Sequence, residues 1–208
     1  MATATRNLST PLPADTTELI SVNIDWLRQA LSLLARMDDA TYNFSPELVA
    51  PHRVGGHLRH VLEFYECFLD GVESSYIDYD ARQRDPLVET SRQAAASKVC
   101  SLIRRLDETA ILRRDSPVFV RMESSETERP PDVFLLSSVC RELQALSSHT
   151  IHHFALIAMT LRVMGFPVGA EFGMSPSTLR YRASLETAAQ KKPAASQIAA
   201  DEAVACAQ

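Results

Sequence analysis

The sequence has few glycines and no paired cysteines. Only six of its 208 residues are glycine, and no Gly-rich phosphate-binding loop is present. Gly55 and Gly56 are adjacent, and we interpret them as the start of a helix. Their lack of side chains would let His57 approach a neighbouring element closely. No Cys-x-x-Cys motif occurs among the four cysteines, which are Cys67, Cys100, Cys140 and Cys206. This spacing argues against a disulfide framework and against a thiolate zinc finger.

The sequence also lacks an excess of positive charge and any long apolar run. Its formal net charge is -5, so it has no basic field for binding nucleic acid. Residues 1–13 contain one arginine and no apolar stretch, and no segment reaches about 18 uninterrupted apolar residues. A hydrophobic content of 46% is sufficient for one buried core. We therefore expect a cytoplasmic protein with neither a nucleic-acid nor a membrane partner.

Apolar residues recur at helical spacing in four long segments. The first begins at Asp15, a good N-cap with Glu18 three residues later. The last begins at Ser138 and stops at Gly165, because glycine commonly ends a helix. The pattern predicts helices over about 15–39, 54–70 with a stop at Gly71, 87–113 and 138–164.

Two short strands are predicted before the last helix, at 117–122 and 133–136, around a polar turn. The fold class is therefore all-α, a four-helix bundle with a short inserted β-hairpin and disordered termini. The expected organisation is a flexible arm over 1–14, one domain over 15–185 and a disordered tail over 186–208. Residues 76–86 are dense in charge and aromatics, which favours a wall of the functional site over a simple connector.

All six histidines fall within 52–60 and 149–153. In a helix, His149 and His153 are one turn apart and about 40° apart around the axis, so both rings can reach one ion. His57 supplies a third ring, whereas His60 and His152 are assigned supporting or surface roles. Three imidazoles with an open position are typical of a catalytic divalent metal site, with zinc favoured and nickel or iron also suited. The alternative, that each ring is an ordinary hydrogen-bonded residue, stays open.

Glu142 is the candidate catalytic group. It lies seven residues before His149, about 20° away around the helix axis, so it could be a fourth ligand, an acceptor for an imidazole N–H or a general base. The favoured alternative is an ion pair with Arg141 or Arg59. Thr150 stands where a His-Glu-x-x-His peptidase has glutamate, which disfavours that class. Three arginines are candidates to bind an anionic substrate, although surface ion pairing is favoured for them: Arg59, Arg82 and Arg84.

The histidine pattern resembles the DinB-like superfamily. The resemblance depends on Gly56-His57-Leu58 in the second helix and His-x-x-x-His at His149 and His153 in the last, and it covers roughly residues 15–165. It implies a four-helix bundle, often dimeric, with a three-histidine metal site at these positions and thiol S-transferase or hydrolase activity. Phe154-Ala155-Leu156 stands where many members of the superfamily carry Arg-Gly-Gln. Because of this departure, the chain resembles a divergent bacterial branch of the superfamily.

These patterns together predict a metal-binding protein. We expect a metal-dependent transferase or hydrolase in which the open metal position activates a thiol or a water molecule. Thiol S-transfer is favoured over hydrolysis, with a small-molecule substrate, a low-molecular-weight thiol as the candidate co-substrate and a homodimer as the assembly. The rival prediction is a non-catalytic bundle that binds metal or a small ligand, or that dimerises through an apolar face.

Overall fold

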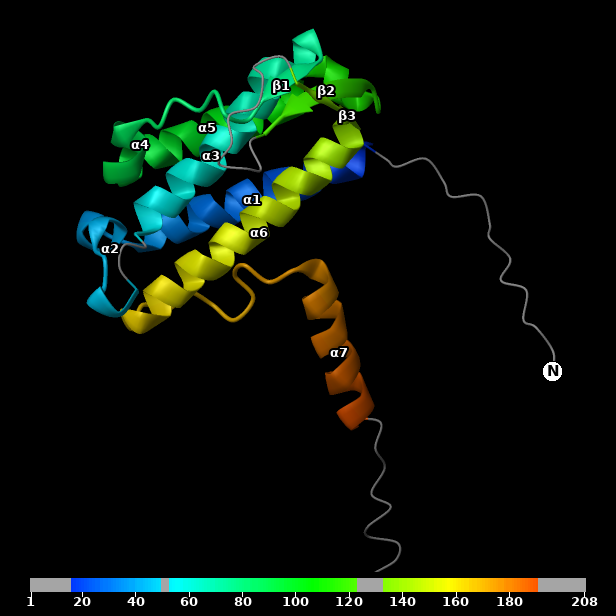
Figure 1. The fold of residues 1–208 in the computed structure, drawn as a ribbon. Helices are drawn as coiled ribbons and strands as arrows, with labels where there is room; N and C mark the ends of the chain where they lie inside the picture. The colour runs from blue at the N-terminus through cyan, green and yellow to red at the C-terminus, as the bar shows by residue number, and fades with distance from the viewer. Residues whose placement is uncertain (1–15, 50–52, 123–132, 191–208) are drawn as a thin grey trace, which may run out of the picture. The chain divides into compact units, whose positions relative to one another are not determined.

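The computed structural model describes residues 16–49, 53–122 and 133–190 (Figure 1). The chain divides into two compact units, one ending at Gly173 and the other beginning at Met174. The second unit contains α7 (Pro176–Gln190), which continues past residue 185, where we expected the bundle domain to end. The predicted arm over 1–14, the Asp15 cap and residues 191–208 of the predicted tail lie outside the described residues.

Four long helices form the bundle in the first unit. They are α1 (Thr16–Arg36), α3 (Val54–Gly71), α5 (Arg92–Glu108) and α6 (Val139–Val163). Both α1 and α3 pack against α5 and α6, which places α1 and α3 at opposite corners of the bundle. The predicted mostly helical bundle with a short β insertion is confirmed. Along the described part of the chain, no helix is both long enough and apolar enough to cross a membrane.

Local signals set the ends of α6 as predicted. The Ser138 side chain accepts a hydrogen bond from the backbone N–H of Arg141, which satisfies a donor that the first turn leaves free. At the other end, Gly165 takes a left-handed conformation with φ of 73°.

The end of α3 differs from the prediction. Gly71 stays right-handed, and the left-handed residue is Ser75, after the short 3-10 helix η2 (Val72–Ser74). Glycine is required at position 71 for a different reason, since a Cβ atom there would lie 2.3 Å from the carbonyl oxygen of Tyr76. The turn after α3 is thus packed directly against the helix.

The prediction of one helix over 87–113 was wrong, because the chain breaks it twice. The segment contains α4 (Pro86–Thr90), α5 and the 3-10 helix η3 (Ala110–Arg113). Ser91 adopts an extended conformation and its side chain accepts from the backbone N–H of Ala94, so it ends one helix and caps the next. Two further short helices, α2 (Asp39–Asn43) and η1 (Glu47–Val49), lie between α1 and α3 and were not among the four predicted helices.

A three-stranded sheet stands at one end of the bundle (Figure 1). Strands β2 (Pro117–Arg121) and β3 (Leu135–Ser138) pair antiparallel, with Val118 opposite Ser137, which confirms the predicted hairpin. Strand β1 (Tyr76–Asp78) was not predicted and pairs parallel with β2. It brings the charged and aromatic segment over 76–86 against the sheet and the bundle.

A buried hydrogen-bond network joins α1, α3 and α6. The Tyr65 hydroxyl donates to Asn23 Oδ1 at 2.7 Å and lies 3.1 Å from Thr150 Oγ1. The Asn23 amide donates across the helix interface to the carbonyl of Leu143 at 3.0 Å. All three polar side chains are fully buried, so displacing one helix would leave polar groups unsatisfied. This network fixes how α3 and α6 face each other.

Gly55 lets α4 and α2 approach the first turn of α3. A Cβ atom at position 55 would lie 2.0 Å from the carbonyl oxygen of Glu89 and 2.9 Å from the Tyr42 ring. The sequence had suggested that the glycines let His57 approach a neighbour. In the structure the close approach at Gly55 is instead made by Glu89 and Tyr42.

We predict that Gly55→Ala lowers the free energy of unfolding by about 1–3 kcal/mol, because the methyl group overpacks a site bounded by backbone. Gly56→Ala is the matched control, since its Cβ atom would meet only a flexible Glu89 side-chain atom at 3.9 Å. It should be neutral or gain up to about 1 kcal/mol. Urea unfolding of both variants measures the difference, and equal effects would contradict the assigned role of Gly55.

Candidate metal centre

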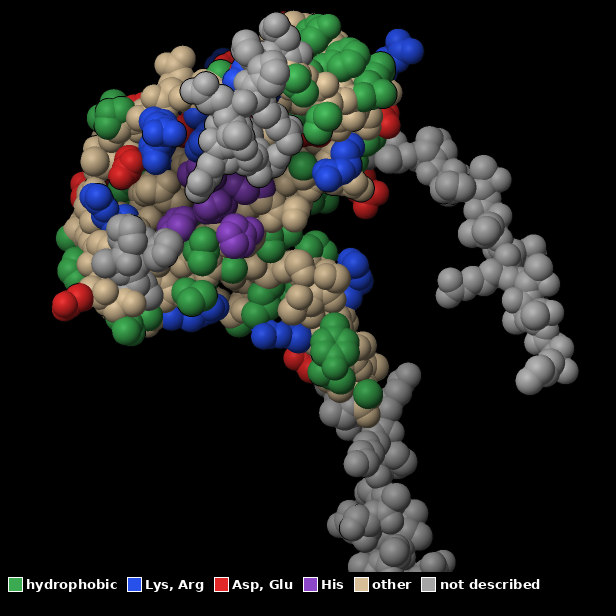
Figure 2. Space-filling view, viewed as in Figure 1, with side chains coloured by type: hydrophobic (Ala, Val, Ile, Leu, Met, Phe, Trp, Pro, Cys, Tyr) green, Lys and Arg blue, Asp and Glu red, His purple; other side chains and the backbone are tan. Residues whose placement is uncertain are grey.

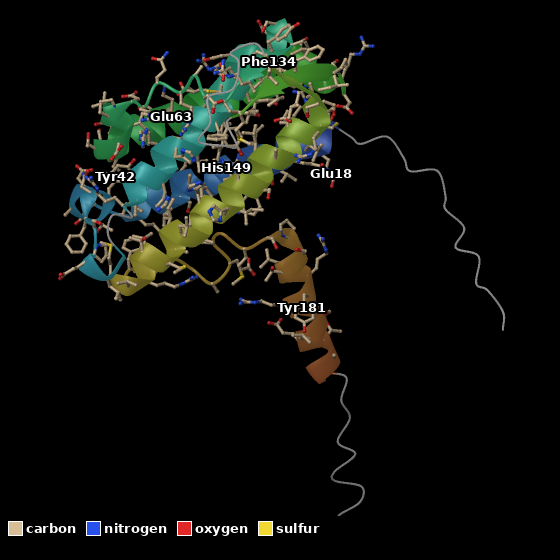
Figure 3. All side chains as sticks on the ribbon, in the orientation of Figure 1. Glu18, Tyr42, Glu63, Phe134, His149 and Tyr181 are labelled. Carbon is tan, nitrogen blue, oxygen red and sulfur yellow. The ribbon has the colours of Figure 1, made fainter. Side chains whose placement is uncertain are left out.

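Histidine side chains of α3 and α6 gather into one patch on the face shown in Figure 2, with Lys and Arg side chains beside it. His60, His149 and His153 each offer one ring nitrogen, and the three nitrogens lie within 4.8 Å of one another. Figure 3 labels His149, which lies where α6 faces α3. All three rings are half-buried. We call these three residues the histidine cluster.

The spacing within the cluster fits a small divalent ion. His60 Nε2 and His149 Nε2 are 3.2 Å apart. Two imidazole nitrogens bound to one tetrahedral zinc at about 2.0–2.1 Å are about 3.3 Å from each other. This pair therefore needs little rearrangement to share an ion of that size, and the third nitrogen, of His153, lies within 4.8 Å of both. Imidazole is a preferred ligand of zinc, nickel and iron.

His57 also reaches the cluster, through a contact of 3.0 Å between its Nδ1 and Nδ1 of His153. Sequence spacing chose His57 as the third ligand and gave His60 a supporting role, whereas the structure brings His60 into the set with His149 and His153. His152 is exposed, and its ring centroid lies 5.1 Å from that of His153. Four rings thus meet, three of them with metal-ligand spacing.

Arg82 determines which nitrogen of His60 carries its proton. One of its terminal nitrogens, Nη1, lies 2.6 Å from His60 Nδ1, and because a guanidinium can only donate, Nδ1 must be the acceptor. The proton of neutral His60 is then on Nε2, which donates to His149 Nε2. His149 carries its own proton on Nδ1, a buried atom without a hydrogen-bond partner. Without metal, the cluster therefore leaves one buried donor unsatisfied.

Burial lowers the pKa of all three cluster imidazoles. Repulsion between protonated histidine rings lowers the pKa further for all three, and the Arg82 charge does so for His60 and His149. The pKa of His60 and that of His149 fall from 6.5 to about 4, and the pKa of His153 falls to about 3. All three rings are consequently neutral at pH 7. Neutral imidazole is the form that a metal ion requires.

Phe64 supplies much of the apolar surface around the cluster. Its ring centroid lies 4.1 Å from that of His149 and 4.9 Å from that of His60. Tyr79 stacks on the same ring at 5.1 Å, and the Arg82 guanidinium lies 5.3 Å from the ring centre. Tyr79 and Arg82 therefore bring part of the segment over 76–86 to the site, as we expected from its composition.

Glu142 is buried beside the cluster and is not one of its three members. Its carboxylate accepts hydrogen bonds from the Tyr79 hydroxyl at 2.9 Å and from the Ser137 hydroxyl at 2.6 Å. The structure thus gives Glu142 hydroxyl partners in place of the ion pair weighed from the sequence. Sequence reasoning missed Tyr79 and Ser137, and only the aromatic density of 76–86 pointed toward the former.

Two pockets border the histidine cluster. A polar pocket of about 460 Å³ is lined by His57, His60 and His153 together with Arg53, Arg59 and Glu89. A second pocket of about 510 Å³, which we call the apolar chamber, has His149 and Glu142 in its wall. Most of its remaining lining is hydrophobic, including Phe64, Tyr79, Met122, Leu135, Leu136 and Leu146. The cluster is therefore reached from one polar and one apolar side.

The three candidate substrate-binding arginines have different surroundings. Arg59 forms ion pairs with Glu89 at 2.9 Å and Glu63 at 3.3 Å while lining the polar pocket. Arg82 contacts His60 and also donates to the carbonyl of Tyr79. Arg84 is exposed, with a left-handed backbone at φ of 52°. The structure places Arg59 and Arg82 at the site, whereas Arg84 is exposed and lines neither pocket.

Comparison with known proteins gives one partial similarity. No protein-family model matches the chain, and no solved structure matches it. Over 105 residues the chain is 30% identical to a protein of Rhizopus delemar named FK506-binding protein 5. The matched stretch is 50% of this chain and 27% of that protein, so the chain spans about a quarter of its relative's length.

We predict that Arg82→Gln increases zinc affinity about 10–100-fold, the range typical for groups that orient a metal ligand. Binding of an ion at His60 Nε2 requires the proton on Nδ1, where Arg82 now presents a donor of its own. Glutamine removes a positive charge and can accept from that N–H. Competition with a chromophoric chelator measures the affinity.

Arg84→Gln is the matched control for this experiment, because it removes the same charge from the exposed part of the same loop. It should leave zinc affinity unchanged. Weaker binding by Arg82→Gln, with its metal-free stability intact, would show that Arg82 supports the metal-bound state instead of opposing it.

We predict that the chelator-treated protein loses stability as the pH falls from 7 to 5. The cluster imidazoles have folded pKa values below their unfolded value of 6.5, so the unfolded chain binds more protons in this interval. Hydrogen bonds lower the pKa of the Asp38 and Asp115 carboxyls, but their contribution is lost only below about 3.8. Urea unfolding at several pH values checks this, and His149→Gln should reduce the slope. A flat profile between pH 7 and 5 would contradict it.

Proposed function

We propose that this chain is a metal-dependent enzyme whose histidine cluster holds a divalent ion, most suitably zinc. The observation that carries the proposal is the 3.2 Å separation of His60 Nε2 and His149 Nε2, with the His153 nitrogen close by. Three imidazole ligands leave a position open, and an ion held in this way lowers the pKa of a thiol or water and polarises a substrate. We propose thiol S-transfer as the reaction, with hydrolysis as the alternative.

The surrounding side chains support this proposal through water exclusion and charge. Phe64 shields His149 and His60 from water, which strengthens electrostatic interactions at the cluster. Arg53 and Arg59 line the polar pocket beside His57, His60 and His153, so an anionic group of a small thiol co-substrate would meet positive charge there. Glu89 and Glu63 already pair with Arg59, which limits how much of its charge is open to a substrate.

Membership of the DinB-like superfamily and a homodimeric state belong to the same proposal. The four-helix bundle and the pairing of an α3 histidine with two α6 histidines support the first. The second is supported by exposed apolar residues at one register position of the sheet, namely Tyr76, Phe119 and Leu136. Sedimentation equilibrium of the full chain tests the dimer.

A non-catalytic metal- or ligand-binding bundle is the second candidate. One observation favours it, because the Glu142 carboxylate, the candidate base, is occupied by the Tyr79 and Ser137 hydroxyls. In that case the cluster would bind an ion for stability or storage. The two candidates predict the same metal content and different activities.

Metal analysis of protein purified without a His tag tests the cluster. We expect one zinc per chain for wild type and a loss of affinity of more than about 100-fold in His60→Gln, beyond what an orienting residue produces. His152→Gln is the control, since this ring is exposed on the same helix. His57→Gln decides between the two candidate ligand sets. Greater loss in His57→Gln than in His60→Gln would favour the set chosen from sequence, and absence of stoichiometric metal would refute the proposal.

Catalysis is tested separately on the zinc-loaded protein. Conjugation of cysteine to 1-chloro-2,4-dinitrobenzene reports thiol transfer, and cleavage of 4-nitrophenyl acetate reports hydrolysis. Activity that is lost in His60→Gln and kept in His152→Gln would support an enzyme. Stoichiometric zinc with neither activity would favour the non-catalytic bundle.

A further inference from the structure

The apolar chamber has an unusual combination of wall groups. Its volume of about 510 Å³ is within the range of small-molecule sites. Hydrophobic side chains from α3, β2, β3 and α6 make up most of the wall, and the His149 ring of the histidine cluster is part of it. Buried among them is the carboxylate of Glu142, whose residue is 6% exposed. The chamber therefore offers an apolar body and one strongly polar spot.

The polar groups of the chamber are mainly acceptors. The hydroxyl hydrogens of Tyr79 and Ser137 both point to Glu142, so each hydroxyl can offer a ligand only its oxygen. The carboxylate keeps unused lone pairs, since a carboxylate can accept about four hydrogen bonds. Among the described residues of the wall, Arg141 is the one that carries a positive charge, and it is exposed. A ligand placed against Glu142 must therefore donate a hydrogen bond and must not be an anion.

We propose that the apolar chamber binds a small apolar molecule that carries one hydroxyl or amino group, with that group on Glu142 and the apolar body against Phe64 and Leu146. This deepens the proposed function, because it rests on the metal site for its chemical use and would place the substrate next to His149. Binding itself depends only on the chamber. The polar pocket on the other side of the cluster remains free for a second, anionic compound.

The chemistry of the occupant is tested with two matched probes, 2-naphthol and 2-naphthoate. They share one ring system, but the first donates a hydrogen bond and the second is an anion at pH 7. Calorimetric titration of the full chain, with and without zinc, should show 2-naphthol binding at least about tenfold more tightly, since the buried carboxylate repels an anion. Glu142→Gln should reduce this preference. Equal affinities, or tighter naphthoate binding, would overturn the proposal.

The place of binding is tested by filling the chamber. Ala145 lines it from α6, whereas Ala155 on the same helix is exposed and lies outside it. Ala145→Trp should abolish 2-naphthol binding while zinc affinity is kept, and Ala155→Trp should change neither. Binding kept in Ala145→Trp would overturn the proposal.

Two further outcomes separate this proposal from others. Naphthol binding without stoichiometric zinc would refute the metal site and support ligand binding in the apolar chamber. Zinc binding without naphthol binding would support the metal site and refute ligand binding in the chamber. Light scattering of wild type and Ala145→Trp tests whether a second copy covers the chamber. A wild-type dimer that dissociates on Ala145→Trp, with no naphthol bound, would show that the chamber is an interface between copies.

Discussion

The geometry of the candidate site depends on the buried hydrogen bonds around Tyr65. This hydroxyl joins Asn23 of α1 and approaches Thr150 of α6, while Asn23 also binds the backbone of α6. Each group is fully buried, so an axial shift of α3 or α6 would strand polar atoms in an apolar core. Thr150 follows His149 directly, and Tyr65 lies five residues after His60. The network therefore sets the distance between the two histidine-bearing helices.

The sequence predicted the elements whose signals are local. The apolar period gave α1, α3 and α6, and Ser138 and Gly165 gave the ends of α6 almost to the residue. It did not give the break at Ser91, because a serine within an amphipathic run reads equally well as a surface residue of one helix. Strand β1 was missed because its three residues depend on parallel pairing with β2, about forty residues later.

The candidate site was predictable to the level of the helices and not to the level of each ligand. His57 and His60 are three residues apart in α3, so both lie on the side that faces α6. Which ring comes closer to His149 depends on the rotation of α3 about its axis. Contacts distant in the sequence set that rotation, such as Tyr65 with Asn23 and Gly55 against Glu89. The partners of Glu142 could not be predicted either. Tyr79 follows β1 and Ser137 belongs to β3, so their contacts with Glu142 also depend on tertiary packing.

The apolar side of the site and the protonation state of the histidine cluster have a common origin. Phe64 belongs to the wall of the apolar chamber, and its ring also lies against His149 and His60. Burial of this kind is the main cause of the lowered imidazole pKa values, and it is what keeps the nitrogens unprotonated for a metal ion. An apolar ligand in the chamber would exclude further water from His149 and so favour the neutral ring. Since His149 is already neutral at pH 7, this coupling acts only toward its pKa of about 4, where protonation of the ring would weaken ligand binding by the same factor by which the ligand opposes protonation.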